Sequence, residues 1–286
     1  MSFKPLSPQK SDIQYHLASR KKDKIRSDII VGTGDNKVII NDENLTIIAG
    51  PCSLESRDDS VALAKTLKIC GANIFRGMIF KPRSSPYSFQ GVGKTGIETI
   101  KAIKSEVDIP IVSEARNESE ADVIAENCDL LQIGTRNMTN YQLLEYIGRL
   151  NIPILLKRGM GSTIEEWLCA AEYILNQGNQ RVILCERGIR TFETATRFTL
   201  DIAAIPLVKE LSHLPVIIDP SHASGKRSLV PPLSIAGVGA GANGIMIEVH
   251  NKPESAFSDA QQTVSVETFS ELVKLAKIVS KTIKFQ

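Results

Sequence analysis

Short apolar runs alternate with longer segments of helical period along most of the chain. The runs are hydrophobic at successive positions rather than at every second one, which is typical of parallel strands covered on both faces. They predict strands at Leu45–Ala49, Asn73–Ile79, Ile109–Ser113, Leu130–Ile133, Ile152–Leu156, Val182–Leu184, Pro215–Ile218 and Gly244–Val249. The segments between them predict helices at Asp58–Cys70, Gly96–Glu106, Glu118–Asn127, Ser162–Asn176 and Ala195–Leu211. Pro206 is expected to break or bend the last helix.

Repeated strand–helix alternation favours an α/β fold of the closed (β/α)8 TIM-barrel type over an open doubly wound sheet, which is the alternative. The 286 residues of the chain suit one such barrel, which needs about 250 residues. We assign residues 45–286 to the barrel and residues 1–44 to a short N-terminal extension. Within the extension, Ser11–Ser27 is expected to form a charged amphipathic helix and Val38–Ile40 a short strand. These elements can close the bottom of the barrel, but they are too short for a regulatory domain.

Charge and cysteine content narrow the class of function. The net charge is only +2, which gives no bulk electrostatic argument for binding to nucleic acid or to a membrane surface. No run is apolar for long enough to cross a bilayer, and the N-terminus does not resemble a signal peptide. The five cysteines are scattered and form no CxxC pair, so we expect free thiols and a cytoplasmic location.

Charged residues gather directly after the apolar runs, where barrel enzymes build their active sites. The second, fourth, fifth and sixth strands are followed by cations with no matching acidic excess: Arg76, Lys81, Arg83, Arg136, Lys157, Arg158 and Arg187. Burying several cations together is costly without counter-charges, which favours a ligand with more than one anionic group, such as carboxylate and phosphate. Arg158 is the cation most expected to point outward, because it directly follows Lys157.

A second set of residues follows the seventh, eighth and first strands. Cys52, His222 and Glu248, with Asp259 in the next loop, offer a thiolate, an imidazole and two carboxylates. Barrel closure brings the last strand beside the first, and this donor set suits a divalent transition-metal ion. No compact metal motif is present, and a lone cysteine such as Cys52 is more often a small buried apolar residue. His222 could equally be a general base, and His250 shares strand parity with Glu248, so it is a rival ligand.

Seven segments, taken in order, resemble one family. They are IIAGPCSLES, FRGMIFKPRSSPYSFQGVG, LLQIGTRN, ILLKRGMG, VILCERGIRTFETATRFTLD, IIDPSHASGKRSLV and IMIEVHNKPESAFSDAQQ, and they span residues 47–262. This set resembles the 3-deoxy-D-arabino-heptulosonate 7-phosphate (DAHP) synthase family, in its shorter type I-beta branch. The resemblance implies a transferase that condenses phosphoenolpyruvate with D-erythrose 4-phosphate and releases phosphate. An enzyme with that activity is a 3-deoxy-7-phosphoheptulonate synthase, and the resemblance therefore implies the first step of the shikimate pathway to aromatic amino acids.

The resemblance also implies roles for individual residues. The family's metal ligands fall on Cys52, His222, Glu248 and Asp259, which selects His222 over His250. Its phosphoenolpyruvate-binding residues fall on Arg76, Lys81, Arg136, Lys157 and Arg187. Its erythrose 4-phosphate contacts fall on Lys81, Pro82, Arg83 and Ser84. Lys157 is expected to transfer protons, because an ammonium group crowded by other cations gives up its proton more readily, and Glu114 is expected to orient a water molecule.

The resemblance implies one divalent metal ion per subunit, with Mn²⁺ preferred and Fe²⁺, Co²⁺ or Zn²⁺ as alternatives. It also implies a homo-oligomer, either a tetramer or a dimer. The alternative activity is that of 3-deoxy-D-manno-octulosonate 8-phosphate synthase, which uses arabinose 5-phosphate. In that family an asparagine interrupts the counterpart of Lys81-Pro82-Arg83, and the asparagine is missing here. A third hypothesis is a non-catalytic barrel that binds anionic metabolites.

Overall fold

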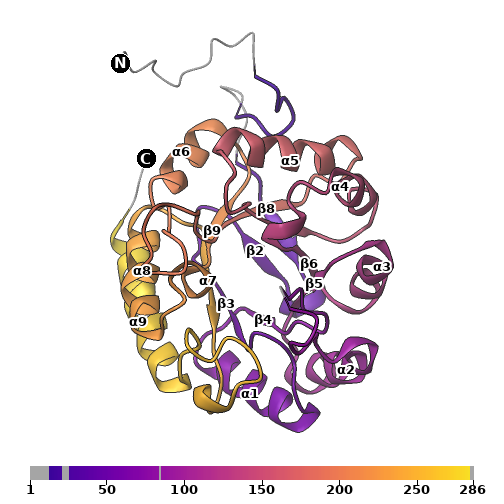
Figure 1. The fold of residues 1–286 in the computed structure, drawn as a ribbon, viewed down its shortest axis with the longest axis vertical. Coiled ribbons are helices and arrows are strands. Elements are labelled where there is room, and N and C mark those ends of the chain that lie inside the picture. The colour runs from indigo at the N-terminus through magenta and orange to yellow at the C-terminus, as the bar shows by residue number, and fades with distance from the viewer. Residues whose placement is uncertain (1–12, 21–25, 84, 284–286) are drawn as a thin grey trace.

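Parallel strands form a closed ring at the centre of the molecule, and helices surround it (Figure 1). The computed structural model describes residues 13–20, 26–83 and 85–283. The ring follows chain order and closes where β10 pairs with β3. Its strands are β3 (Thr46–Gly50), β4 (Ile74–Arg76), β5 (Ile111–Ala115), β6 (Leu130–Ile133), β7 (Ile154–Lys157), β8 (Val182–Glu186), β9 (Val216–Ile218) and β10 (Gly244–Glu248). The predicted (β/α)8 barrel and all eight of its predicted strands are therefore confirmed.

Several helices around the ring begin at polar residues that cap them. Ser56, Thr163 and Ser265 each accept a hydrogen bond from the backbone N–H three residues further on, which satisfies a donor that the helix leaves open. The helices are α1 (Arg57–Ile69), α2 (Gly96–Val107), α3 (Glu118–Asn127), α4 (Tyr141–Ile147), α5 (Ile164–Asn176), α6 (Ala204–Leu211), α7 (Pro220–Ser224), α8 (Val230–Gly239) and α9 (Val266–Thr282). None of the helices in the described ranges is both long enough and apolar enough to span a membrane.

The predicted helix at Ala195–Leu211 is wrong in its first half, because the helix begins only at Ala204. The backbone before it is bonded to another element: Arg197 N donates to the carbonyl oxygen of Ser224 at 3.0 Å, and Phe198 N donates to that of Ala223 at 2.8 Å. These partners replace the hydrogen bonds that a helix would supply. Pro206 does not break α6, because it lies in the first turn, where the N–H needs no partner within the helix.

The predicted amphipathic helix at Ser11–Ser27 is also wrong for the residues that the structure describes. Residues 13–20 form turns rather than a helix, and residues 11, 12 and 21–25 lie outside the described ranges. The backbone N–H groups of Leu17 and Ala18 donate to the Glu172 carboxylate on α5, at 2.7 and 2.8 Å. In the predicted helix these N–H groups would bond to backbone carbonyl groups of the same helix. In the structure a carboxylate of the barrel accepts their hydrogen bonds instead.

A hairpin covers one end of the barrel. The predicted strand Val38–Ile40 is present as β2, and it pairs in antiparallel fashion with β1 (Ile29–Val31). Buried side chains of the hairpin pack with interior side chains of the barrel strands, and Figure 1 shows β2 within the ring. Gly32, which follows β1, lies against Pro110 just before β5. The hairpin thus lies where the barrel strands begin, opposite the ends that carry the charged residues.

Arg158 takes part in a buried ion-pair network outside the strand ring, as its position after Lys157 suggested. Its Nη1 lies 2.9 Å from Glu186 Oε2 and 2.8 Å from Asp201 Oδ2. Its guanidinium carbon lies 5.9 Å from the centre of the Trp167 ring. Burial raises the pKa of Glu186 despite the arginine beside it. The network joins the ends of β7 and β8 to the segment that leads into α6.

Replacing Arg158 with methionine should lower the free energy of unfolding by about 3–5 kcal/mol, because Glu186 would stay buried without its charged partner. Urea unfolding followed by circular dichroism measures the change. Arg149→Met is the matched control, since Arg149 is exposed and bonded to Gln177 on the surface. A loss for Arg158→Met no larger than that of the control would show that the network contributes nothing to stability.

Candidate active site

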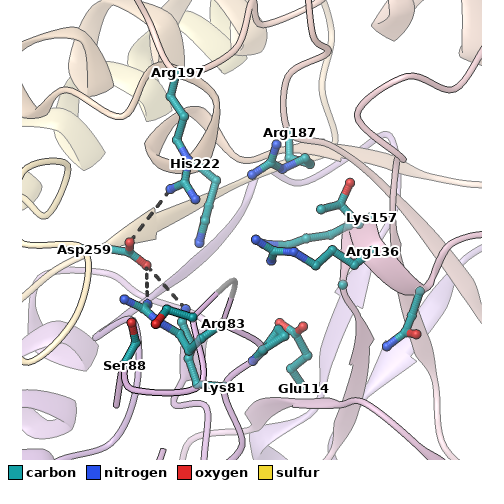
Figure 2. A pocket seen from close by; sticks show the side chains of 15 residues that line it. Lys81, Arg83, Ser88, Glu114, Arg136, Lys157, Arg187, Arg197, His222 and Asp259 are labelled. Carbon is teal, nitrogen blue, oxygen red and sulfur yellow. Dashed lines mark ion pairs between the residues drawn. The ribbon is translucent and has the colours of Figure 1, made fainter. Parts of the chain in front are cut away.

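The carboxyl ends of the strands surround a cavity of about 240 Å³ (Figure 2). The predicted site residues that line it are Lys81, Pro82, Arg83, Glu114, Arg136, Lys157, Arg187, His222 and Asp259. Cys52 and Glu248 are buried beside it and contact lining residues, and Arg76 is buried against Glu248. Ser84 lies outside the described residues. The fold therefore brings the two sequence sets, one cationic and one of metal-ligand type, to one place.

The four predicted metal ligands form a compact group. One donor atom each from Cys52, His222, Glu248 and Asp259 lies within 4.8 Å of all the others. Glu248 ends β10 and pairs with Gly50 at the end of β3, so ring closure brings it close to Cys52. Cys52 Sγ lies 2.7 Å from Asp259 Oδ2, and His222 Nε2 lies 3.2 Å from Glu248 Oε1.

The surroundings of this group fit a divalent cation. His222 Nδ1 lies 2.7 Å from Asp219 Oδ2, which turns Nε2 toward the other donors, as outer carboxylates do for metal-bound histidines. Burial and the negative charge of Glu248 raise the pKa of the Cys52 thiol, so a nearby cation is needed to hold the thiolate form. Burial opposes ionisation of Asp259 too, but Lys81 and His222 hold its pKa well below the usual range. The donor set combines a soft sulfur with harder nitrogen and oxygen atoms, which suits a transition-metal ion.

His250 lies apart from this group. Its Nδ1 lies 2.8 Å from the carbonyl oxygen of Lys252, and its Nε2 lies 3.5 Å from Glu55 Oε2. Among the four histidines of the chain, the one brought together with Cys52, Glu248 and Asp259 in the described structure is His222.

The cations of the cavity have more acidic partners than the sequence indicated. Arg76 Nη2 lies 3.1 Å from Glu248 Oε1, and Lys81 Nζ lies 3.5 Å from Asp259 Oδ2. The expected lack of counter-charges was therefore wrong for these residues. The carboxylates come from strands far along the chain that become neighbours only when the ring closes, so reading each strand end by itself missed them.

Several buried guanidinium donors nevertheless lack a partner among the described residues. They are Nε and Nη1 of Arg76 and Nη1 of Arg187. Burial also lowers the pKa of Arg187. Buried N–H groups without acceptors are costly, and arginine donors suit carboxylate and phosphate oxygens. These atoms therefore form part of a binding site for an anionic ligand.

Asp219 joins the cationic set to the metal-ligand set, and the sequence reasoning missed it as a site residue. Its Oδ2 lies 2.6 Å from Lys157 Nζ and 2.7 Å from His222 Nδ1. Its Oδ1 accepts from His222 N at 3.1 Å, which starts the short helix α7 at Pro220. Although burial opposes it, the charges of His222 and Lys157 hold the pKa of Asp219 well below its usual range. The signal in the sequence was the Asp-Pro pair before His222.

Glu114 faces the cavity from the end of β5, and its position depends on one residue of β6 and on the glycine just after that strand. Gln132 Nε2 donates to Glu114 Oε2 at 2.5 Å. Gly134 leaves room for the other oxygen, because a Cβ atom at this position would lie 2.2 Å from Glu114 Oε1. Sequence reasoning missed both supporting residues, although they belong to the LLQIGTRN segment.

The amino-acid sequence of this chain is similar to those of known proteins. The model of the DAHP synthetase I family matches residues 23–284. The phospho-2-dehydro-3-deoxyheptonate aldolase of Thermotoga maritima is 48% identical over 263 residues, which cover 92% of this chain and 77% of that protein. A 2-dehydro-3-deoxyphosphooctonate aldolase of Geobacter sulfurreducens is 28% identical, with 85% of this chain and 95% of that protein covered.

Solved structures agree with the sequence relatives. A crystal structure of the Thermotoga maritima phospho-2-dehydro-3-deoxyheptonate aldolase (DAHP synthase) superposes with a TM-score of 0.88 and 46% identity, covering 94% of this chain and 78% of that chain. A truncated form of 3-deoxy-D-arabino-heptulosonate 7-phosphate synthase from the same organism gives 0.85 and 43%, covering 94% and 97%. With nearly all of its barrel matched by the family model, the chain belongs to the DAHP synthetase I family.

Proposed function

We propose that this site condenses phosphoenolpyruvate with D-erythrose 4-phosphate and releases phosphate. The chain is an enzyme, an aldolase-type transferase that acts as a 3-deoxy-7-phosphoheptulonate synthase, as its family and its 48% identical relative indicate. The first step of the shikimate pathway follows from that activity. The structural observation that carries the proposal is the single cavity in which a metal-ligand group adjoins buried arginine donors that lack partners.

Phosphoenolpyruvate fits the cationic part of the cavity. It carries a carboxylate and a phosphate, and the open donors of Arg76 and Arg187 would bind oxygen atoms of that kind. In the proposal it contacts Arg76, Lys81, Arg136, Lys157 and Arg187. The deep burial of most of these residues excludes water and strengthens each interaction.

The aldehyde would lie beside the metal-ligand group. A divalent metal ion held by Cys52, His222, Glu248 and Asp259 would supply Lewis acidity toward the aldehyde oxygen. The proposed contacts of erythrose 4-phosphate are Lys81, Pro82, Arg83 and Ser84. Arg83 Nη1 lies 3.9 Å from Asp259 Oδ2, so this arginine stands next to the ligand group.

The bond changes follow from the two substrates. Carbon 3 of phosphoenolpyruvate attacks the aldehyde carbon, a carbon–carbon bond forms, and positive character develops at carbon 2. Lys157 gives a proton to the aldehyde oxygen, which becomes a hydroxyl group. Glu114 orients the water that adds at carbon 2 and accepts its proton. The C–O bond between carbon 2 and the phosphate then breaks, the hydroxyl group left on carbon 2 becomes the keto group of the product, and its proton goes to the departing phosphate.

The metal, the assembly and the location are finer parts of the proposal. We propose Mn²⁺ as the metal, with Fe²⁺, Co²⁺ and Zn²⁺ as alternatives, since the mixed donor set suits each of them. We propose a homo-oligomer, a tetramer or a dimer. We also propose a cytoplasmic location, which the five free cysteines support.

One assay tests the activity. Purified protein with Mn²⁺ and phosphoenolpyruvate should release phosphate with erythrose 4-phosphate and not with arabinose 5-phosphate. Chelation should abolish the release, and added Mn²⁺ should restore it. Release with arabinose 5-phosphate alone would favour the octulosonate activity, and release with neither sugar would mean a non-catalytic barrel. Full activity in a metal-free preparation would contradict the proposed metal.

A further inference from the structure

Arg197 lines the cavity and has no role in the reaction described above. Figure 2 shows its side chain reaching Asp259 from the side opposite Arg83. Arg197 comes from the segment between β8 and α6, a segment that the sequence pattern assigned to a helix. Its side chain is 39% exposed, whereas that of Asp259 is 17% exposed. Arg197 therefore lies toward the opening of the cavity rather than at its base.

The backbone of Arg197 is held firmly although its side chain is partly exposed. Its N–H donates to Ser224 at 3.0 Å, and the next residue donates to Ala223 at 2.8 Å. Both acceptors belong to α7, the helix that carries His222. The Arg197 side chain therefore starts from a fixed point relative to the metal-ligand group, which reduces the entropy lost when it binds a ligand.

Arg187 and Arg197 both pack on the same aromatic ring. The Arg187 guanidinium carbon lies 4.3 Å from the centre of the Phe198 ring, and that of Arg197 lies 5.8 Å from it. The ring stabilises both cations through its π face. Arg187 is buried whereas Arg197 is partly exposed, so we expect them to bind two different anionic groups rather than one.

Arg197 and Arg83 flank one carboxylate without forming hydrogen bonds to it. Arg197 Nη1 lies 3.8 Å from Asp259 Oδ1, and Arg83 Nη1 lies 3.9 Å from Asp259 Oδ2. Both distances exceed hydrogen-bond length. Asp259 also faces Lys81 at 3.5 Å, so three cations share one carboxylate. Arg197 Nη1 also donates to Gln262 Oε1 at 3.2 Å, on the protein side of the cavity. The local excess of positive charge around one carboxylate suits a dianion.

A second hollow continues outward from this point. It has a volume of about 700 Å³ and shares Arg83, Arg197 and Asp259 with the inner cavity. The two arginines therefore stand where the inner cavity opens into the outer one. An anionic group at the far end of a substrate would lie between them when its other end reaches the metal-ligand group.

We propose that Arg197, together with Arg83, binds the terminal phosphate of the aldehyde substrate. The inference rests on the proposed condensation and adds a specificity residue to it. Arg187 then binds phosphoenolpyruvate and Arg197 binds the sugar phosphate, and both side chains pack on the Phe198 ring. Two arginine forks enclose the phosphate from opposite sides of Asp259, which selects for a phosphorylated aldehyde over a neutral one.

The test compares aldehydes with and without the phosphate. Arg197→Met should lower kcat/KM for erythrose 4-phosphate by about 10- to 100-fold, since it removes a charge-assisted contact. With D-erythrose, which lacks the phosphate, wild type and variant should have the same kcat/KM. KM for phosphoenolpyruvate and the bound metal content should also be unchanged. Arg190→Met, in the same segment and exposed, is the control and should behave as wild type.

Binding of erythritol 4-phosphate, which cannot react, gives a second measurement by calorimetry. Its Kd should rise by a similar factor in Arg197→Met and recover partly in Arg197→Lys, which restores the charge. Equal losses with erythrose and erythrose 4-phosphate, or an unchanged Kd for the analogue, would overturn the role of Arg197. Failure of the wild type to turn over erythrose 4-phosphate would instead overturn the proposed function on which the inference rests.

Discussion

Cys52→Ala should lose tight metal binding and with it the condensation activity. Losing an outer hydrogen-bond partner of a metal ligand typically weakens metal affinity by about 10- to 100-fold, and loss of the ligand itself should exceed that. The remaining group would keep His222, Glu248 and Asp259, but not the sulfur that favours a transition-metal ion. The bound metal can be measured by atomic absorption after dialysis, and the activity by phosphate release.

Two other cysteines provide controls for that experiment. Cys128 is buried, and burial raises the pKa of its thiol, whereas Cys70 is half-buried at the end of α1. Neither belongs to the group that could hold a metal in the described structure. Cys70→Ala and Cys128→Ala should retain bound metal and activity. Normal metal content in Cys52→Ala would rule out Cys52 as a ligand.

Lys157→Met should lower kcat by about 10²- to 10⁴-fold, the usual range for loss of a positioned proton donor or acceptor. Two effects combine in this variant. The ammonium group that lines the cavity is lost, and Asp219 loses a partner that lies 2.6 Å away. Steady-state kinetics with both substrates measure kcat and each KM separately.

The split between kcat and KM decides which role Lys157 has. A near-normal kcat with a raised KM for phosphoenolpyruvate would make Lys157 a binding residue without a role in proton transfer. Metal content should be measured in parallel, because Asp219 also contacts His222. Lys101→Met is the control, since Lys101 is exposed and paired with Glu98 on α2.

The barrel could be predicted from the sequence because parallel strands covered on both faces leave a strong signal. Their runs are apolar without alternation, and those assigned to the ring appear as strands in the structure. The errors occurred where a segment takes its hydrogen bonds from distant residues. Residues 13–20 bond to α5, and the segment before Ala204 bonds to α7. Local periodicity carries no information about such partners.

The site could be predicted in part for a similar reason. The types and strand positions of Cys52, His222 and Glu248 suggested a metal group, and ring closure brings them within reach of one another. The supporting residues were not predictable in this way. Asp219 and Gln132 act through single hydrogen bonds to neighbours whose side-chain directions only the folded structure supplies. Their role is visible in geometry and not in residue type.

The hairpin of β1 and β2 closes the end of the barrel where its strands begin, which limits the routes by which ligands can reach the cavity. In the described part of the chain, interior side chains and this hairpin fill that end, so we expect both proposed substrates and both products to use the opposite end. Arg76 and Lys157 lie deep in the site, and Arg197 stands at its rim. With the substrate positions proposed above, we expect phosphoenolpyruvate to bind before the sugar phosphate, because a sugar phosphate held near Arg197 would lie between the opening and the deeper residues. Closure of one end of the barrel thus leads us to expect an ordered binding of the two substrates.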